Sequence, residues 1–248
     1  MSGLLVIGAH PDDEVLLAGG TLAACAAAGL EAGVVCMTRG ELGTIADPAL
    51  ATRDTLADVR LGELRASCLE LGTTLVKCWR RPDGSLRWAD RSAIVRQLVG
   101  VFHAHRPKAV ISFGEDGLYH HPDHIATYEL VRRAVKRVPD PPALYRSVWP
   151  RAMMGSLGAE LRRRGLSDDL WELAPEDFGT DDLDGSFAID VRPFVQCKLA
   201  ALRAHRTQVP DHHALAGIDQ GLAERFLGTE WFAPLGGASD WLPRALGR

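Results

Sequence analysis

One segment near the start of the chain combines a histidine, a proline and three acidic side chains. It reads His-Pro-Asp-Asp-Glu at residues 10–14 and directly follows an apolar run. Proline suits the first position of a helix, where its missing N–H costs nothing. We therefore expect His10 to end a strand and Asp13 to lie in the first helical turn, as an imidazole and a carboxylate typical of zinc ligands. Acidic residues in a first turn also oppose the helix dipole favourably, so this segment alone leaves a purely structural role open.

A second segment, from Tyr119 to His124, repeats the arrangement. His121 and His124 are three residues apart, with Asp123 between them, so both rings can share one face of a helical turn. Each segment follows a predicted strand, and the two strands are neighbours if the sheet has the order 3-2-1-4-5. Open α/β sheets bind ligands at such a point, beyond the carboxyl ends of the strands. We therefore predict one metal site that the two segments share.

The other polar side chains of these segments suggest a hydrolytic reaction. Three protein ligands leave one position on zinc open for a water molecule, whose pKa the ion lowers to about 7. Asp12, next to Asp13 but pointing elsewhere, is the candidate base for that water. His121 would act from the other side, as an imidazolium that stabilises the developing oxyanion or protonates the departing amine. Asp123 would orient the His121 ring and favour its charged form.

Short apolar segments alternate with longer amphipathic ones, which predicts an α/β fold with a Rossmann-like, mostly parallel sheet and helices on both faces, in three α/β/α layers. Strands are expected at residues 4–8, 33–38, 75–79, 109–113, 143–148 and 186–190. Helices are expected at residues 12–28, 51–71, 91–105, 122–137, 151–164 and 191–205. From Pro210 onward the sequence predicts a mixture of helix and loop. We expect a single domain over residues 1–248, with residues 150–248 a more divergent part packed on the same fold.

Composition limits the classes of partner. The formal net charge of −4 favours neither a nucleic acid nor an anionic membrane. The longest uncharged stretch, residues 15–30, is too short and too rich in Gly and Ala for a membrane span, and the N-terminus does not resemble a signal peptide. The five cysteines have no CxxC spacing, which suits free thiols in a reducing compartment. We expect a cytoplasmic protein, and the oligomeric state stays open, a homo-oligomer included.

With both motifs in hand, the chain resembles the LmbE-like, or PIG-L, family of de-N-acetylases. AHPDDE at residues 9–14 and HPDH at residues 121–124 match the two signature motifs of that family, and similarity continues through residues 38–43, 60–64 and 81–84. The resemblance implies zinc-dependent hydrolysis of an N-acetylglucosamine-type amide. Matched residue by residue, the resemblance implies that His10, Asp13 and His124 are metal ligands. It implies that Asp12 is the general base and that His121, paired with Asp123, stabilises the transition state.

The resemblance also implies contacts with a small N-acetylated amino sugar. Tyr119 matches a position that helps to polarise the carbonyl, while Arg60, Glu41 and Asp83 match positions that contact hydroxyl or phosphate groups of the substrate. Ordinary alternatives exist, because Arg60 could pair with a glutamate on a helix surface and Asp83 could belong to a turn. His120 departs from the family, which commonly has glycine there, so its side chain could narrow the pocket or add a contact.

Several functions compete with this interpretation. A nucleotide-binding protein needs a glycine-rich turn after the first strand, and the acidic segment 10–14 lacks one. A non-catalytic metal module would be expected to have lost Asp12 or His121, and both are present. An amidase that acts on a thiol–sugar S-conjugate or on another acylated amine is the serious alternative. The metal is also open, because a site of two histidines and an aspartate accepts Fe²⁺ or Co²⁺ as well as Zn²⁺.

Overall fold

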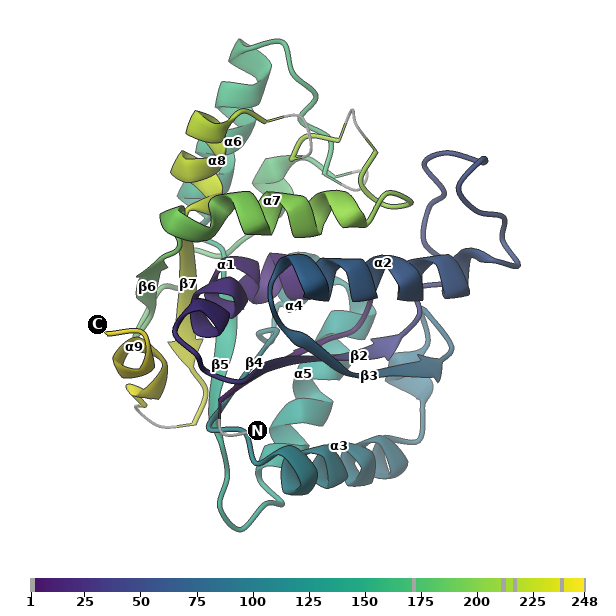
Figure 1. The fold of residues 1–248 in the computed structure, drawn as a ribbon, viewed down its shortest axis with the longest axis vertical. Coiled ribbons are helices and arrows are strands. Elements are labelled where there is room, and N and C mark those ends of the chain that lie inside the picture. Colours follow the sequence, from purple (N-terminus) through teal and green to yellow (C-terminus); the bar gives the residue numbers. More distant parts are fainter. Residues whose placement is uncertain (1–2, 171–172, 211–212, 216–217, 237–238, 248) are drawn as a thin grey trace.

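A seven-stranded sheet with the strand order β3-β2-β1-β4-β5-β7-β6 runs through the molecule (Figure 1). The computed structural model describes residues 3–170, 173–210, 213–215, 218–236 and 239–247. The strands are β1 (Leu4–Gly8), β2 (Ala32–Thr38), β3 (Thr74–Arg81), β4 (Ala109–Ser112), β5 (Ala143–Val148), β6 (Phe187–Asp190) and β7 (Thr229–Pro234). The α-helices are α1 (Asp13–Ala27), α2 (Leu56–Glu70), α3 (Arg91–His105), α4 (Gly117–His120), α5 (Pro122–Val135), α6 (Arg151–Arg163), α7 (Val195–Ala204), α8 (Gln220–Leu227) and α9 (Trp241–Ala245).

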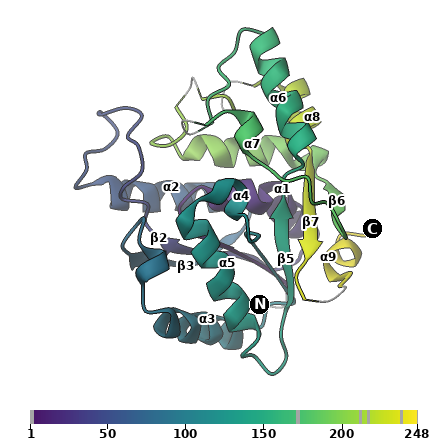
Figure 2. The ribbon, with the colours of Figure 1, turned by 180° about the vertical axis from the view of Figure 1, so that it is seen from behind.

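Helices cover both faces of the sheet. α1, α2 and α7 lie on one face, and α3 and α5 lie on the other (Figure 1, Figure 2). The first five strands pair in parallel in the predicted order, and β1 is buried at every position. A continuous apolar strand is typical of a parallel sheet that is covered on both faces. The predicted α/β fold with a mostly parallel sheet is confirmed.

The largest departure from the predicted elements is β7. It lies between β5 and β6 and pairs antiparallel with both, where the sequence predicted helix and loop. A glutamate, Glu230, occupies a buried position of β7 together with Phe232, and this charge hides the alternation that would have identified a strand. α2 is a smaller departure, because it begins at Leu56 and not at Ala51.

The fold brings the two motifs together because β1 and β4 are neighbours. Residues 9–13 leave the carboxyl end of β1 for α1, and residues 113–121 leave the adjacent end of β4 for α5. The second connection is strained, since Leu118 has φ 66° and His120 has φ 62°. Left-handed backbone in bulky residues is costly and is often found at functional sites.

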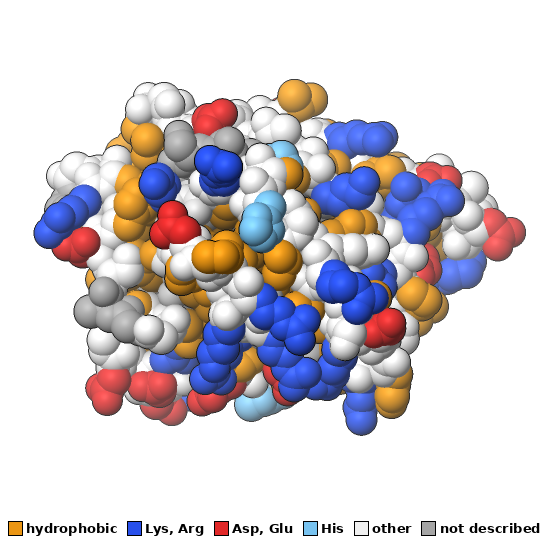
Figure 3. Space-filling model, turned by 90° about the horizontal axis from the view of Figure 1, so that it is seen from below, with side chains coloured by type: hydrophobic (Ala, Val, Ile, Leu, Met, Phe, Trp, Pro, Cys, Tyr) orange, Lys and Arg blue, Asp and Glu red, His pale blue; other side chains and the backbone are white. Residues whose placement is uncertain are grey.

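The exposed surface shows no segregation of charge on the face opposite the α2 and α7 layer. Figure 3 shows Lys and Arg side chains spread over this face, with Asp, Glu and apolar side chains among them. Within the described residues, no helix is long and apolar enough to cross a membrane.

Candidate active site

The three predicted metal ligands converge at the carboxyl ends of β1 and β4. His124 Nε2 lies 3.3 Å from His10 Nδ1 and 3.3 Å from Asp13 Oδ1. His10 Nδ1 lies 3.7 Å from Asp13 Oδ2. Ligand atoms that surround a tetrahedral zinc ion at about 2.0–2.2 Å are themselves about 3.3 Å apart. The two histidine nitrogens, and His124 Nε2 with Asp13 Oδ1, therefore have the spacing that such an ion needs.

The outer nitrogen of each histidine is engaged elsewhere, which leaves a lone pair on the nitrogen that faces the centre. His124 Nδ1 donates to the carbonyl oxygen of Gly117 at 3.1 Å. His10 Nε2 lies 3.0 Å from Asp83 Oδ1 and 3.5 Å from Asp123 Oδ2, so these carboxylates hold a proton on Nε2. When His10 Nδ1 carries no proton, its lone pair faces that of His124 Nε2, and the two repel each other unless a cation lies between them. Such outer partners are the usual means of orienting histidine ligands on a metal.

The charges around the centre also favour a cation. Burial by itself would lower the pKa of His10, but hydrogen bonds with Asp123 and Asp83 and the charge of Asp13 raise it to about 10. Burial opposes the ionisation of Asp13, yet His124 and His10 hold its pKa well below the ordinary value. The donor set and the buried carboxylates thus fit a divalent metal ion.

Gly8 allows Asp13 to reach this position. A Cβ atom on Gly8 would lie 2.6 Å from the Cβ atom of Asp13, so any other residue there would push the aspartate away. Asp13 Oδ2 accepts hydrogen bonds from the backbone N–H groups of Ala9 and His10, both at 2.7 Å. These bonds hold the carboxylate against the end of β1 with Oδ1 turned towards His124.

Asp83, Asp123 and Glu41 each make contacts within the protein that the sequence did not predict. Asp83 faces His10, and this contact outweighs burial and lowers the pKa of Asp83 to about 2. Glu41 Oε1 accepts from the Asp83 N–H at 2.9 Å. The Asp123 carboxylate accepts from the N–H groups of Gly84 and Leu86, at 2.9 and 3.0 Å, and not from the His121 ring. All three acids lie at the site, but their carboxylate oxygens make contacts within the protein, with His10 or with backbone N–H groups near it.

Asp12 is fixed beside the metal site by Arg60. The Asp12 backbone has φ 116°, and its Oδ2 accepts from Arg60 Nη2 at 3.0 Å. Arg60 also donates to the carbonyl oxygens of Gly40 and Pro11, at 2.8 and 2.6 Å, and a Cβ on Gly40 would lie only 2.1 Å from Nη1. Burial raises the pKa of Asp12 to about 6 against the opposing charge of Arg60. The alternative of a surface pair between Arg60 and Glu63 is therefore wrong.

His121 lies next to both histidine ligands, and its ring nitrogen is within 4.8 Å of theirs. Its Nδ1 accepts from the Asp123 N–H at 3.2 Å, so the proton of the neutral ring is on Nε2. Burial, together with His124 and His10, lowers the pKa of His121 to about 4. The predicted imidazolium is corrected here: this geometry holds a neutral ring with an Nε2–H donor.

Tyr119 packs its ring edge-on against His124, with the centroids 5.2 Å apart, and against His121 at 5.8 Å. Burial raises the pKa of Tyr119, and Asp13 and Asp12 raise it further, so its hydroxyl stays protonated. The side chain lines the same cavity as Asp12. Tyr119 therefore lies where the sequence predicted a group that donates to a carbonyl.

Glu14 and His205 form a buried contact that neither motif predicted. The Glu14 carboxylate is buried and accepts from the Asp12 N–H at 3.0 Å and from Ser67 Oγ. His205 Nε2, at the end of α7, lies 2.7 Å from Glu14 Oε1. Glu14 so links α7 and α2 to the backbone of Asp12. The only signal for this link was the third acid of the first motif.

A cavity of about 280 Å³ opens in front of the metal site. Its lining includes His10, Asp12, Arg60, Tyr119 and Gln208. His120 lies outside this cavity and lines a separate groove with Arg87 and Pro122.

Three aromatic side chains that could stack on a sugar lie away from this cavity. Trp88 is 70% exposed, Phe232 is fully buried, and Trp231 lines a different pocket.

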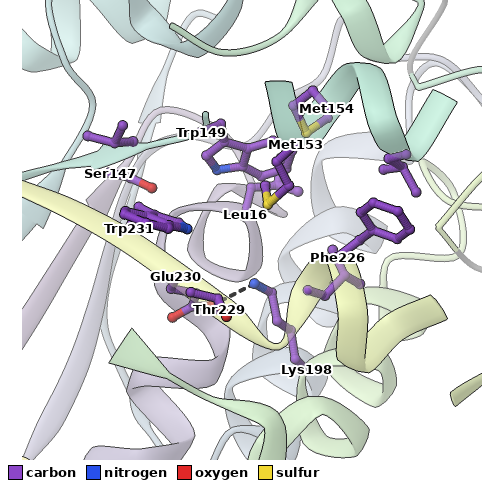
Figure 4. A pocket seen from close by; sticks show the side chains of 13 residues that line it. Leu16, Ser147, Trp149, Met153, Met154, Lys198, Phe226, Thr229, Glu230 and Trp231 are labelled. Atoms are coloured by element: carbon purple, nitrogen blue, oxygen red, sulfur yellow. Dashed lines mark hydrogen bonds and ion pairs between the residues drawn. The ribbon is translucent and has the colours of Figure 1, made fainter. Parts of the chain in front are cut away.

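That pocket lies between α1, α6, α8 and β7 and is mostly apolar (Figure 4). Trp149, Trp231 and Met153 surround it, and Lys198 pairs with Glu230 at 2.6 Å on one side. Its free volume of about 20 Å³ is near that of one water molecule. Leu16 lines both this pocket and the cavity at the metal site.

Comparisons with known proteins identify the family. The family described as GlcNAc-PI de-N-acetylase (PIG-L) matches residues 5–135. The 1D-myo-inositol 2-acetamido-2-deoxy-alpha-D-glucopyranoside deacetylase of Thermobispora bispora is 34% identical, over 98% of this chain and 91% of that protein. The N,N'-diacetylchitobiose deacetylase of Pyrococcus horikoshii is 25% identical, with a TM-score of 0.64 over 94% of this chain and 84% of that chain.

The fold alone does not determine the reaction. The structure of GalB, the 4-carboxy-2-hydroxymuconate hydratase of Pseudomonas putida, matches with a TM-score of 0.65 at 21% identity, over 96% of this chain and 98% of that one. The family match and the deacetylase relatives decide between the reactions. The chain belongs to the PIG-L family of de-N-acetylases and is a metal-dependent hydrolase of carbon–nitrogen bonds other than peptide bonds.

Proposed function

We propose that this de-N-acetylase uses zinc to remove the acetyl group from an N-acetylglucosamine glycoside that carries a polyol, such as 1D-myo-inositol 2-acetamido-2-deoxy-α-D-glucopyranoside. The observation that carries the proposal is the convergence of His10 Nδ1, His124 Nε2 and the Asp13 carboxylate beside an open cavity with both polar and apolar lining. The similarity to the Thermobispora bispora deacetylase over nearly the whole chain supports the choice of substrate.

The proposed roles follow from the positions of the side chains. Zinc bound by His10, Asp13 and His124 would polarise the amide carbonyl and lower the pKa of a water molecule. Asp12 accepts the proton of that water at Oδ1, because Arg60 already holds Oδ2.

The remaining groups act on the amide itself. His121 donates its Nε2–H to the carbonyl oxygen as negative charge develops there, and the protonated Tyr119 hydroxyl is a second donor from the same wall. The proton that Asp12 receives is available to the departing amine.

The cavity lining supports a hydroxyl-rich substrate. Gln208 Nε2 donates to the Thr44 carbonyl at 2.8 Å. This hydrogen bond leaves the amide oxygen of Gln208 facing Gly43. Arg60 and Asp83 lie on the same wall. We propose that these groups contact sugar and polyol hydroxyls at the mouth of the cavity, beyond the bonds that they make within the protein.

The test is acetate release from a panel that isolates each part of the substrate. The panel contains free N-acetylglucosamine, its inositol and malate glycosides, N,N'-diacetylchitobiose and an S-conjugate amide, each with protein as purified, chelated and zinc-restored. We expect zinc to restore activity, and the inositol glycoside to exceed the free sugar in kcat/KM by about tenfold or more, as contacts with the extra hydroxyls allow. Preference for the S-conjugate would favour the alternative amidase, and release independent of metal would contradict the zinc mechanism.

We further propose that residues 1–248 act as one domain in the cytoplasm. β6 and β7 extend the same sheet as β1, and α7 packs against α1 and α2, which supports a single unit. The five cysteines are free thiols, as is usual in a reducing compartment.

A further inference from the structure

Two cysteines lie opposite each other on neighbouring strands next to the active site. Cys36 in β2 and Cys78 in β3 are register partners in the parallel pair. A bulge creates this pairing: Gly33 pairs with Thr74, and an uninterrupted register would bring Lys77 opposite Cys36. Bulges are a common means of redirecting a side chain, and here the bulge directs a thiol towards a thiol.

Both sulfur atoms lie against the same carbonyl group. Cys36 Sγ is 3.2 Å and Cys78 Sγ is 3.3 Å from the Thr38 carbonyl oxygen, and both thiols donate to it. Adjacent strands are about 4.8 Å apart, within the range of about 4.4–6.8 Å between Cα atoms that a disulfide spans. The pair can therefore be joined with little movement of the backbone.

The two thiols differ in exposure and in pKa, and these differences indicate which thiol reacts first. Cys36 is buried, whereas Cys78 is partly exposed on the edge strand β3. The neighbouring Cys36 thiol lowers the pKa of Cys78 against the effect of burial, and Arg39 and Arg65 lower it further. A partly exposed thiol near positive charge is the more reactive one.

We propose that Cys36 and Cys78 form a peroxide-sensitive dithiol that closes to a reversible disulfide and slows the enzyme. The Cys78 thiolate attacks one oxygen of hydrogen peroxide, the O–O bond breaks, and the hydroxide released takes up a proton to give water. Cys36 sulfur then attacks the Cys78 sulfenic acid, and the S–O bond breaks as the Cys36 proton leaves with the second water. Two thiols and one peroxide so give one disulfide and two water molecules.

A short path of hydrogen bonds connects the dithiol to the metal site. The Thr38 N–H and hydroxyl both donate to the Ala9 carbonyl at 2.9 Å, and Cys36 Sγ lies 3.6 Å from the same oxygen. The Ala9 N–H in turn holds Asp13 Oδ2. Drawing the two sulfur atoms into a bond changes the end of β2 that supports Ala9. A displacement of about 1 Å at a catalytic position can cost up to about 100-fold in rate, so we expect disulfide formation to reduce kcat by roughly tenfold.

The experiment treats the metal-loaded, full-length protein with hydrogen peroxide, blocks free thiols with N-ethylmaleimide and maps peptides by mass spectrometry. We expect a Cys36–Cys78 linked peptide that dithiothreitol removes. The Cys78→Ser variant should not form it, and the matched control Cys197→Ser, which leaves the pair intact, should form it as the unaltered protein does. Linkage of Cys78 to Cys68, or no linkage before sulfinic acid appears, would overturn the proposal.

The second measurement is deacetylation before oxidation, after oxidation and after reduction. We expect a loss of turnover that dithiothreitol reverses and that Cys78→Ser prevents. Unchanged turnover in protein shown to be linked would overturn the inhibitory role. Only this second measurement rests on the proposed function, because the linked peptide is detected without any substrate.

Discussion

Two clusters of buried charge next to α1 have opposite characters. At the metal site, His10, Asp13 and His124 turn lone pairs towards one point beside an open cavity. Between α7 and β7, Lys198 and Glu230 form an ion pair in which both carboxylate oxygens of Glu230 accept hydrogen bonds. Glu230 accepts from Lys198 Nζ at 2.6 Å and from two backbone N–H groups of α1, each at 2.8 Å.

The difference shows which property marks a functional site. Both clusters are buried, and both contain charges that are expensive to remove from water. In the ion pair, contacts within the protein offset the free energy of removing the charges from water. The neighbouring pocket has little free volume. At the metal site, the donor atoms of His10, Asp13 and His124 face one another beside a cavity. A site that binds a ligand is therefore distinguished from one that stabilises the fold by donor atoms that face a shared point, more than by burial or charge.

The most severe test of this comparison removes a metal ligand. We expect His124→Ala to lose zinc and to reduce deacetylation to background, because the remaining His10 and Asp13 cannot hold the ion in an active geometry. The measurements are zinc content after dialysis and acetate release. His103→Ala, an exposed histidine on α3, is the matched control and should behave as the unaltered protein. A full complement of tightly bound zinc in His124→Ala would remove it from the ligand set.

The next test keeps the metal and removes the base. Asp12→Asn preserves the shape of the side chain and an oxygen for the Arg60 bond, but it cannot accept the proton of water. We expect kcat to fall by about 100- to 10,000-fold, with zinc content unchanged. Loss of zinc would mean that Asp12 is itself a ligand, and nearly full activity would transfer the role of base to another group.

The sequence predicted the five parallel strands and the meeting of the two motifs because both depend on local patterns. Apolar runs predict buried strands, and each motif places its polar residues within one helical turn. What it could not predict are partners separated by long stretches of chain. Glu14 meets His205, and Asp12 meets Arg60, only because α1, α2 and α7 form one layer. The role of Asp123 was missed for the same reason, since its partners lie in the loop after β3.

The third test addresses the contrasting ion pair. Lys198→Met leaves the Glu230 carboxylate buried without its cation, and breaking a buried pair in this way typically costs about 3–5 kcal/mol of stability. We expect a lower urea midpoint of unfolding and, in the protein that remains folded, unchanged zinc content and turnover. The double variant Lys198→Met/Glu230→Gln removes both charges and should recover part of the loss. A specific loss of zinc in Lys198→Met would break the distinction between the two clusters.

The smallest expected effect is a shift in pH dependence, and it tests whether Arg60 tunes the base. Burial raises the pKa of Asp12 to about 6, and the charge of Arg60 opposes this rise. Removing that charge in Arg60→Met should raise the pKa of Asp12 further. Because the base works only when ionised, activity is lost below its pKa, and the acidic limb of kcat/KM should move to higher pH. Arg60→Lys retains the positive charge and should move the limb less.

Arg60 also donates to the Gly40 and Pro11 carbonyls, so either variant can lower the plateau of kcat/KM through structural damage. Such damage alone would leave the position of the acidic limb unchanged. An unshifted limb in Arg60→Met would therefore assign Arg60 to positioning only.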